Sequence, residues 1–174
     1  MLKIRINPRN LWQKGQSNMA KEHHYKTSVV WTGNNGLGTK DYKLYERNYT
    51  ISIENKPDIQ GSADTPFRGD GTKYNPEDLF LSSLSICHML WYLHFCADNG
   101  IIVTDYKDNA LGTMQENTGG GGHFTEVILN PFVTITDKTQ IEKANSLHAD
   151  ANKKCFIANS CNFPVKHKPT CNAV

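Results

Sequence analysis

The 174-residue sequence has no CxxC pair, no secretory signal and no long run of charge of one sign. Lysine and arginine total 19 against 17 aspartate and glutamate, a formal net charge of +2, so charge gives no reason to expect a nucleic-acid partner. The N-terminal residues MLKIRINPRNLWQKGQSNM contain no continuous apolar segment and no small-residue cleavage pattern, which argues against export. Residues 1–24 are expected to form an extension, and its first 18 residues need not be native because Met19 is an alternative start.

The cysteines are odd in number, which excludes a fully paired disulfide framework. Without an export signal, they indicate a reducing cytoplasm, where a cysteine pair is more often catalytic or regulatory than structural. The five are Cys87, Cys96, Cys155, Cys161 and Cys171.

The longest apolar stretch, residues 79–97, is interrupted by serines and histidines, so a buried helix is favoured over a membrane span. Asn75 as N-cap, Pro76 at the first helical position and Glu77 in the first turn mark its start, and Gly100 marks its end. Because the helix is apolar on nearly every face, we expect it to be buried centrally or against a second copy of itself.

Strand signals lie on both sides of this helix, and a second helix follows them. The expected elements are two or three strands in 26–53, a short strand and a long loop in 56–74, strands in 101–116 and 123–136, an amphipathic helix over 138–155, and a last strand near 163–167. One stripe of the second helix holds Ile141, Ala144, His148, Ala151 and Cys155. This order predicts an α+β class, with a mainly antiparallel sheet and two main helices in a single domain over residues 25–174.

Cys87 lies inside the first helix and Cys155 closes the second, so two helices packed on one sheet can bring them together. Periodicity alone favours a plainer interpretation, in which both are small buried hydrophobes. A metal site is a further alternative, because Cys87 and His94 share one helix face, as His148 and Cys155 share another. Neither pair has the i, i+4 or CxxC spacing of a preformed chelate.

Four sequence motifs together resemble the OsmC and Ohr family of osmotically inducible and organic hydroperoxide resistance proteins. They are NPEDLFLSSLSIC, HADANKKCFIANS, SADTPFRGDGTKYNPE and WTGNNGLGT, and the resemblance covers about residues 25–165. The motifs CHML and FRGD resemble the OsmC-like branch more than the organic hydroperoxide reductases. The resemblance implies an OsmC-like fold, an intertwined homodimer and chemistry that needs no metal or organic cofactor.

The resemblance also implies roles for individual residues. Cys87 is the peroxidatic cysteine, Cys155 the resolving cysteine, and Glu77 the carboxylate that holds an arginine against the thiolate. A fixed guanidinium raises the reactive fraction of a thiol whose ordinary pKa is about 8.5. Arg68, in PFRGD, is the first candidate for this arginine, and Arg47, in YERNY, is the second, although each also fits an exposed surface arginine.

Helix geometry limits how Glu77 and Cys87 can meet. Ten residues place them about 15 Å apart along one helix and about 80° apart around it. Either the helix is broken between them, or Glu77 serves the Cys87 of a partner chain. We expect the second arrangement, with two composite sites at a homodimer interface.

The expected function is therefore a two-cysteine thiol peroxidase for organic hydroperoxides, recycled by an external dithiol such as a dihydrolipoyl group. The alternative is a non-catalytic member of the fold that binds a small apolar ligand or responds to redox state. Remaining polar candidates are expected to be bystanders or satisfied core groups: His88, His148, Cys96, Cys171 and Cys161, the last able to compete for a sulfenate. The aromatic residues Phe80, Trp91, Tyr92 and Phe95 are expected in the core more than in a pocket.

Overall fold

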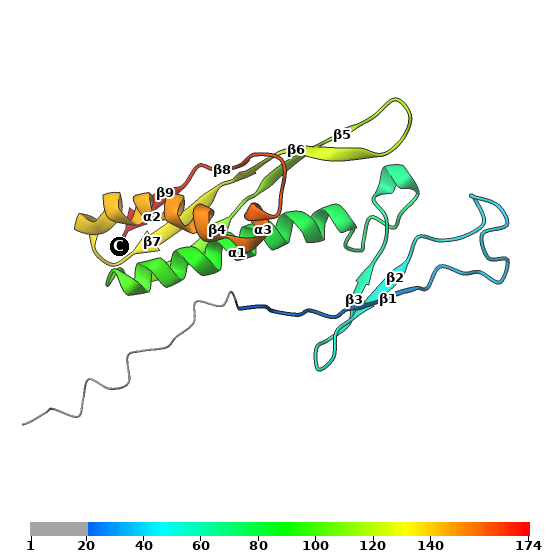
Figure 1. Cartoon of the computed structure of the whole chain (residues 1–174), viewed down its shortest axis with the longest axis horizontal. Helices are drawn as coiled ribbons and strands as arrows, with labels where there is room; N and C mark the ends of the chain where they lie inside the picture. Colours follow the sequence, from blue (N-terminus) through cyan, green and yellow to red (C-terminus); the bar gives the residue numbers. More distant parts are fainter. Residues whose placement is uncertain (1–20) are drawn as a thin grey trace, which may run out of the picture.

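The computed structural model describes residues 21–174, so most of the predicted extension over residues 1–24 lies outside the described residues. The described part mixes helices and strands, which confirms the predicted α+β class (Figure 1). Its elements are β1 (Ser28–Trp31), β2 (Tyr49–Ser52), β3 (Ile59–Gly61), the 3₁₀ helix η2 (Thr65–Phe67), α1 (Pro76–Asp98), β4 (Val103–Asp108), β5 (Leu111–Glu116), β6 (Gly122–Leu129), β7 (Pro131–Ile135), the 3₁₀ helix η3 (Lys138–Gln140), α2 (Ile141–Lys154), α3 (Phe156–Asn159), β8 (Val165–His167) and β9 (Thr170–Ala173).

Helix α1 begins and ends where the sequence predicts. The Asn75 side chain accepts a hydrogen bond from the Asp78 N–H at 2.7 Å, and the Asp78 carboxylate accepts one from the Asn75 N–H at 3.4 Å. This capping box satisfies backbone donors that the first helical turn leaves free. Gly100 then turns the chain with a φ of 68°, a left-handed conformation that suits glycine.

We expected α1 to be buried centrally or against a second copy of itself, and within the single chain it is fully buried on one face only. Its fully buried residues recur at every fourth position: Leu84, His88, Tyr92 and Cys96. Ile86, by contrast, is 50% exposed and Leu90 58% exposed. Length and composition alone would also allow α1 to cross a membrane, but core helices meet the same test, and α1 packs here against α2.

The described sheets are mainly antiparallel, as predicted, with four antiparallel and two parallel strand pairings, and the two parallel ones lie in the sheets that follow α1. Strand β7 pairs antiparallel with β4, and β6 pairs antiparallel with β5. The C-terminal strands β8 and β9 add to β6 and β7 in parallel, and β9 was not predicted. The β7–β9 pairing is parallel because the chain returns through α2, a helical crossover that brings the second strand back in the same direction.

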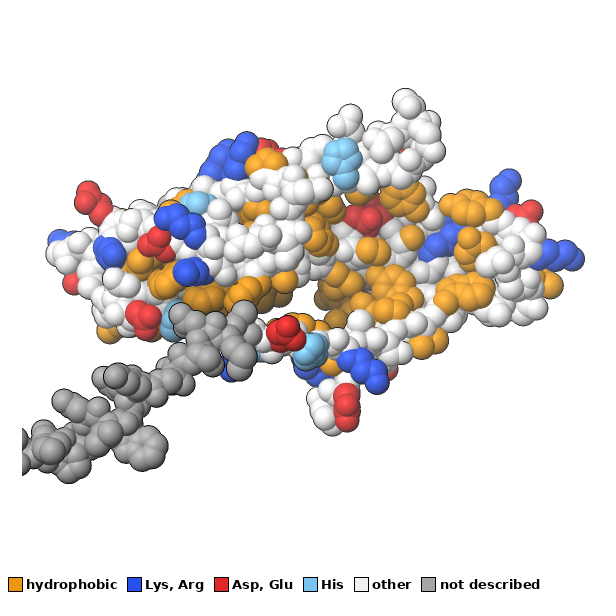
Figure 2. Space-filling model, in the orientation of Figure 1, with side chains coloured by type: hydrophobic (Ala, Val, Ile, Leu, Met, Phe, Trp, Pro, Cys, Tyr) orange, Lys and Arg blue, Asp and Glu red, His pale blue; other side chains and the backbone are white. Residues whose placement is uncertain are grey.

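Two hydrophobic clusters form the described core. One joins α1 and α2 to β7 and β9, and the other joins α1 to β6. The predicted stripe of α2 is confirmed at four of its five positions, since Ala144, His148, Ala151 and Cys155 are at most 1% exposed, and the fifth, Ile141, is partly buried against the core. The sheet β1-β2-β3 contributes no residue to either cluster. It lies apart from the helices, and hydrophobic side chains gather along the hollow between them (Figures 1 and 2).

Candidate active site

The structure brings the two predicted redox cysteines together. Cys87 lies in the fourth turn of α1, and Cys155 occupies the junction where α2 ends and α3 begins. The two thiols are close enough for the Cys87 side chain to be one cause of a raised pKa at Cys155. The helices thus create a dithiol from residues that are 68 positions apart.

The two thiols differ in exposure. Cys155 is 1% exposed, whereas Cys87 is half-buried. Burial first, and then the Cys87 side chain, raises the pKa of Cys155 to about 12. Its sulfur also accepts the backbone N–H of Ala158 at 3.4 Å, which acts in the opposite direction. Cys155 therefore keeps its proton at neutral pH, and Cys87 is the thiol that an incoming oxidant can reach.

Apolar side chains lie beside this dithiol. Leu90 and Trp91 follow Cys87 by three and four positions on α1, and with His94 they line a pocket of about 260 Å³. The Trp91 ring contacts that of Phe156, the residue after Cys155, with 6.0 Å between centroids. Trp91 thus borders a pocket and also packs, partly buried, against the core cluster, so the expectation of a core position holds in part.

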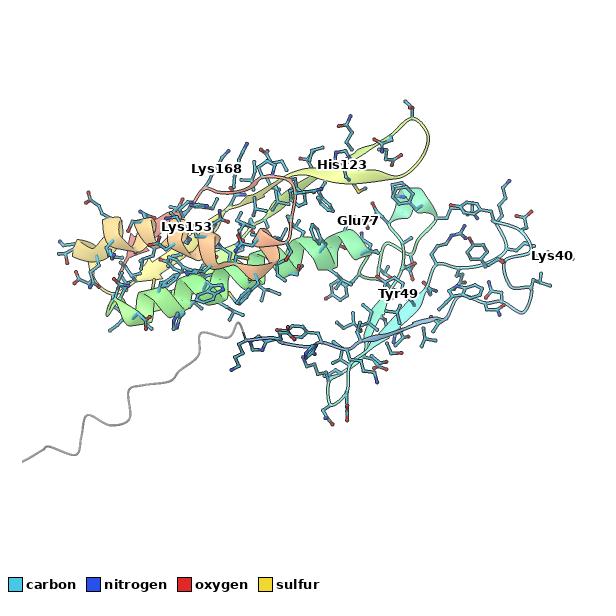
Figure 3. All side chains as sticks on the ribbon, viewed as in Figure 1. Lys40, Tyr49, Glu77, His123, Lys153 and Lys168 are labelled. Atoms are coloured by element: carbon cyan, nitrogen blue, oxygen red, sulfur yellow. The ribbon has the colours of Figure 1, made fainter. Side chains whose placement is uncertain are left out.

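Glu77 lies at the other end of α1 from the dithiol. The helix is continuous from Pro76 to Asp98, so a break that would let Glu77 reach Cys87 is absent. Burial, and then the charges of Glu77 and Asp78, raises the pKa of Tyr49 on β2, which places Glu77 near that strand (Figure 3). One carboxylate oxygen of Glu77 is buried and has no hydrogen-bond partner among residues 21–174. That oxygen is free for a donor from outside this part of the chain.

Both candidate arginines line a second pocket, of about 300 Å³. Arg47 donates to the carbonyl oxygens of Tyr45 and Tyr42, the latter at 2.7 Å, and its guanidinium lies 4.2 Å from both ring centroids. Arg68 is exposed, follows η2 and has a φ of 65°. Within the described chain neither arginine forms an ion pair with a carboxylate. One chain therefore does not unite an arginine, Glu77 and the dithiol.

The residues of the FRGD motif are explained by the conformation of its loop. Gly69 lies so close to Ala63 that a Cβ on it would stand 1.5 Å from the Ala63 carbonyl oxygen. Asp70 then donates its N–H to the Ser62 hydroxyl at 3.0 Å and accepts bonds from Thr72. The segment is a tightly closed loop that presents the preceding arginine to solvent.

Sequence reasoning missed a buried histidine pair. His88 Nε2 and His148 Nδ1 are 2.9 Å apart, and both side chains are at most 1% exposed. Their places on the two buried helical stripes were the available signal. His94, in contrast, is exposed beside Asp98. Among residues 21–174 no group of three or more His, Cys, Asp or Glu side chains is arranged to hold a metal ion.

The remaining cysteines lie outside the dithiol. Cys96 and Cys171 belong to the core cluster between the helices and β7. Cys161 packs in the other cluster and donates its S–H to the Ile157 carbonyl at 3.3 Å. Burial raises the pKa of all three thiols, which disfavours their thiolates.

Solved structures with the same fold cover almost the whole described chain. An OsmC-like protein of unknown function from Vibrio cholerae is 29% identical, with a TM-score of 0.76 over 86% of this chain and 100% of that one. An organic hydroperoxide resistance protein from Elizabethkingia anophelis is 20% identical, with a TM-score of 0.60 over 88% and 100%. A putative organic hydroperoxide resistance protein from V. cholerae, with captopril in one of its active sites, is 22% identical, with a TM-score of 0.58 over 90% and 96%.

No curated protein sequence matches the chain significantly. The model of the OsmC-like protein family, however, matches residues 69–170. These include α1, the helices α2 and α3 on either side of Cys155, and every strand from β4 to β8. Since that match spans more than half of the sequence and agrees with the fold, the chain belongs to the OsmC-like protein family.

Proposed function

We propose that this protein is a two-cysteine thiol peroxidase that reduces organic hydroperoxides. The observation that carries the proposal is the dithiol: a reachable Cys87 that lies close enough to a buried, protonated Cys155 to raise its pKa. Leu90 and Trp91, one turn beyond Cys87 on α1, line an apolar pocket that suits an alkyl or aryl hydroperoxide better than hydrogen peroxide. The hydroperoxide resistance proteins with this fold agree with such a reaction.

The reaction follows from the two thiols. The Cys87 thiolate attacks the outer oxygen of the hydroperoxide, the O–O bond breaks, and the alkoxide leaves as an alcohol after it takes a proton. Cys87 is then a sulfenic acid. The sulfur of Cys155 attacks it, water leaves with the thiol proton, and a disulfide forms. An external dithiol, such as a dihydrolipoyl group, reduces the disulfide by exchange, and no metal or organic cofactor is required.

We further propose that the complete site forms in a homodimer. Glu77 and Cys87 of one chain are separated by the continuous helix α1, so a carboxylate that orients an arginine beside Cys87 comes from a second copy. For such a contact the chain offers a Glu77 oxygen without a hydrogen-bond partner and two arginines without an ion pair among residues 21–174. Arg68 is the first candidate for the guanidinium and Arg47 the second.

The test is a single turnover with one equivalent of cumene hydroperoxide, followed by mass-spectrometric mapping of thiols. The intact protein should consume the peroxide and convert Cys87 and Cys155 to a disulfide. Cys87→Ser should consume none, and Cys155→Ser should stop at a Cys87 sulfenate that dimedone traps. Cys171→Ser serves as the matched control. Recovery of Cys87 and Cys155 as free thiols, with the peroxide intact, would refute the proposal.

One observation favours a second candidate, a non-catalytic module that binds a small apolar ligand or responds to redox state. Arg47 is held by two carbonyls and two rings, and Arg68 lies in solvent, so neither activates a thiol within its own chain. A wild-type protein without turnover, whose Cys87→Ser variant binds an apolar ligand with unchanged affinity, would support this module.

A further inference from the structure

The His88–His148 pair is a buried polar contact between the two helices that carry the redox cysteines. Its imidazole nitrogens are 2.9 Å apart, and the rings are nearly parallel, with an interplanar angle of 8°. The Tyr92 ring stacks on His148 with 3.8 Å between centroids. This pair is therefore held from both helices and closed to solvent.

Both imidazoles are neutral at physiological pH. Burial first, and then the nearby His167, lowers the pKa of His88 to about 4, and burial together with His88 and His167 lowers that of His148 to about 3. In a neutral pair, one nitrogen donates and the other accepts. The opposite nitrogens, His88 Nδ1 and His148 Nε2, have no partner among the described residues, so the single bond between the rings is the polar contact that both keep.

The position of the pair matters for the dithiol. His88 directly follows Cys87 on α1, and His148 precedes Cys155 by seven residues, or two turns, on the same face of α2. A bond between these two side chains fixes the offset of one helix along the other. The same offset decides whether the end of α2 presents Cys155 to Cys87.

We propose that the His88–His148 hydrogen bond is a positioning contact that holds Cys155 in reach of Cys87 and thereby controls disulfide formation rather than the reduction of peroxide. Apolar contacts between helices are non-directional and tolerate small shifts. A buried hydrogen bond does not, because a shift would leave two imidazoles unsatisfied. The proposal rests on the proposed two-cysteine function and adds residues that determine its second step.

The experiment separates the two steps after one equivalent of cumene hydroperoxide is added to the reduced protein. Rapid quenching with dimedone, followed by mass spectrometry, measures the Cys87 sulfenate and the Cys87–Cys155 disulfide over time. His148→Leu should form the sulfenate within twofold of the wild-type rate and the disulfide at least tenfold more slowly. His148→Asn, which keeps a hydrogen-bonding atom near the Nδ1 position, should restore part of the disulfide rate.

Two controls make the result specific. His123→Leu is the same substitution at an exposed position of β6 and should change neither rate (Figure 3). Should His148→Leu fail to fold, His88→Gln and His148→Asn decide the matter, with slower disulfide formation expected in both. Disulfide rates within twofold of wild type in the folded variants, or equal slowing of both steps, would overturn the inference. A wild-type protein that forms no sulfenate would instead overturn the proposed function.

Discussion

At the scale of single residues, the two arginines differ in how firmly they are held. Arg47 has two carbonyl acceptors and two tyrosine rings, which fix its guanidinium in place. Arg68, by contrast, projects from a closed loop and has no ion-pair partner within residues 21–174. An arginine that pairs with Glu77 and a thiolate of another chain must be free in the isolated chain, so Arg68 fits this role better.

This difference predicts the outcome of substituting each arginine. Arg68→Gln should slow the oxidation of Cys87 by cumene hydroperoxide about tenfold or more, because the thiolate loses a neighbouring positive charge. Stopped-flow measurement of the first step tests this, with Lys40→Gln, a charge loss at another exposed loop position, as the control. Should Arg47→Gln slow the step and Arg68→Gln leave it unchanged, the role belongs to Arg47.

Sequence reasoning predicted that Cys87 and Cys155 lie together, but it left open which arginine serves the proposed site. Cys87 and Cys155 lie in or next to helices, where the sequence motifs and the periodic buried positions are sufficient to select them. An arginine side chain is long and flexible, and both candidates lie in the segment before α1, whose loop geometry depends on contacts across β1-β2-β3. Spacing along the chain therefore carried little information about where either guanidinium lies.

At the scale of helices and strands, local signals were reliable and long-range pairings were not. The limits of α1 were predictable because Asn75, Pro76 and Gly100 act within a turn of the chain. The short α3 and the parallel addition of β8 and β9 depend on contacts that form only after α2 packs. The His88–His148 bond was missed for the same reason, since each stripe shows burial but not which partner it meets.

The buried histidine pair predicts acid sensitivity of the packing between α1 and α2. Folding keeps both imidazoles neutral, with pKa values of about 4 and about 3, whereas in the unfolded chain they bind protons near pH 6.5. The unfolded state thus binds more protons below pH 6.5, so stability falls as pH decreases, until the folded-state pKa values are reached. Each histidine should cost about 2 kcal/mol between pH 7 and pH 5.

Urea unfolding at both pH values, at a fixed protein concentration, measures this cost. The groups that face the pair are His167 on β8, whose pKa is also lowered by burial, and Tyr92 on α1. Because His167 adds to the same effect, His148→Leu should lose about a third to a half of the pH effect, and His123→Leu none. An unchanged pH dependence in His148→Leu would show that the pair does not titrate on unfolding.

At the scale of the whole molecule, the single chain exposes apolar side chains on two of its surfaces, the sheet β1-β2-β3 and one face of α1. In the sheet β1-β2-β3, Val29 is 62% and Val30 53% exposed, and the sheet shares no core cluster with the helices. A small sheet of this kind is not stable without a surface to pack on. The exposed face of α1, with Ile86 and Leu90, is apolar as well. A second copy that covers both surfaces accounts for them together.

This arrangement predicts complementation between two inactive variants. Cys87→Ser and Glu77→Gln should each lose most peroxidase activity as homodimers. In a heterodimer of the two, one site combines an intact Cys87 with an intact Glu77 from the other chain, and the second site has neither. Random assembly of equal amounts gives half heterodimers, so activity should recover to about a quarter of wild type.

Co-expression of the variants with different affinity tags supplies the mixture, and native mass spectrometry verifies the heterodimer, at twice the chain mass of 19.6 kDa. If Glu77 acted on Cys87 of its own chain, every site in every dimer would lack one of the two residues, and no activity would return. Because the continuous α1 keeps Glu77 away from Cys87 of its own chain, the composite site needs a second copy. Verified heterodimers without recovered activity would therefore rule it out, and so would a chain that remains monomeric.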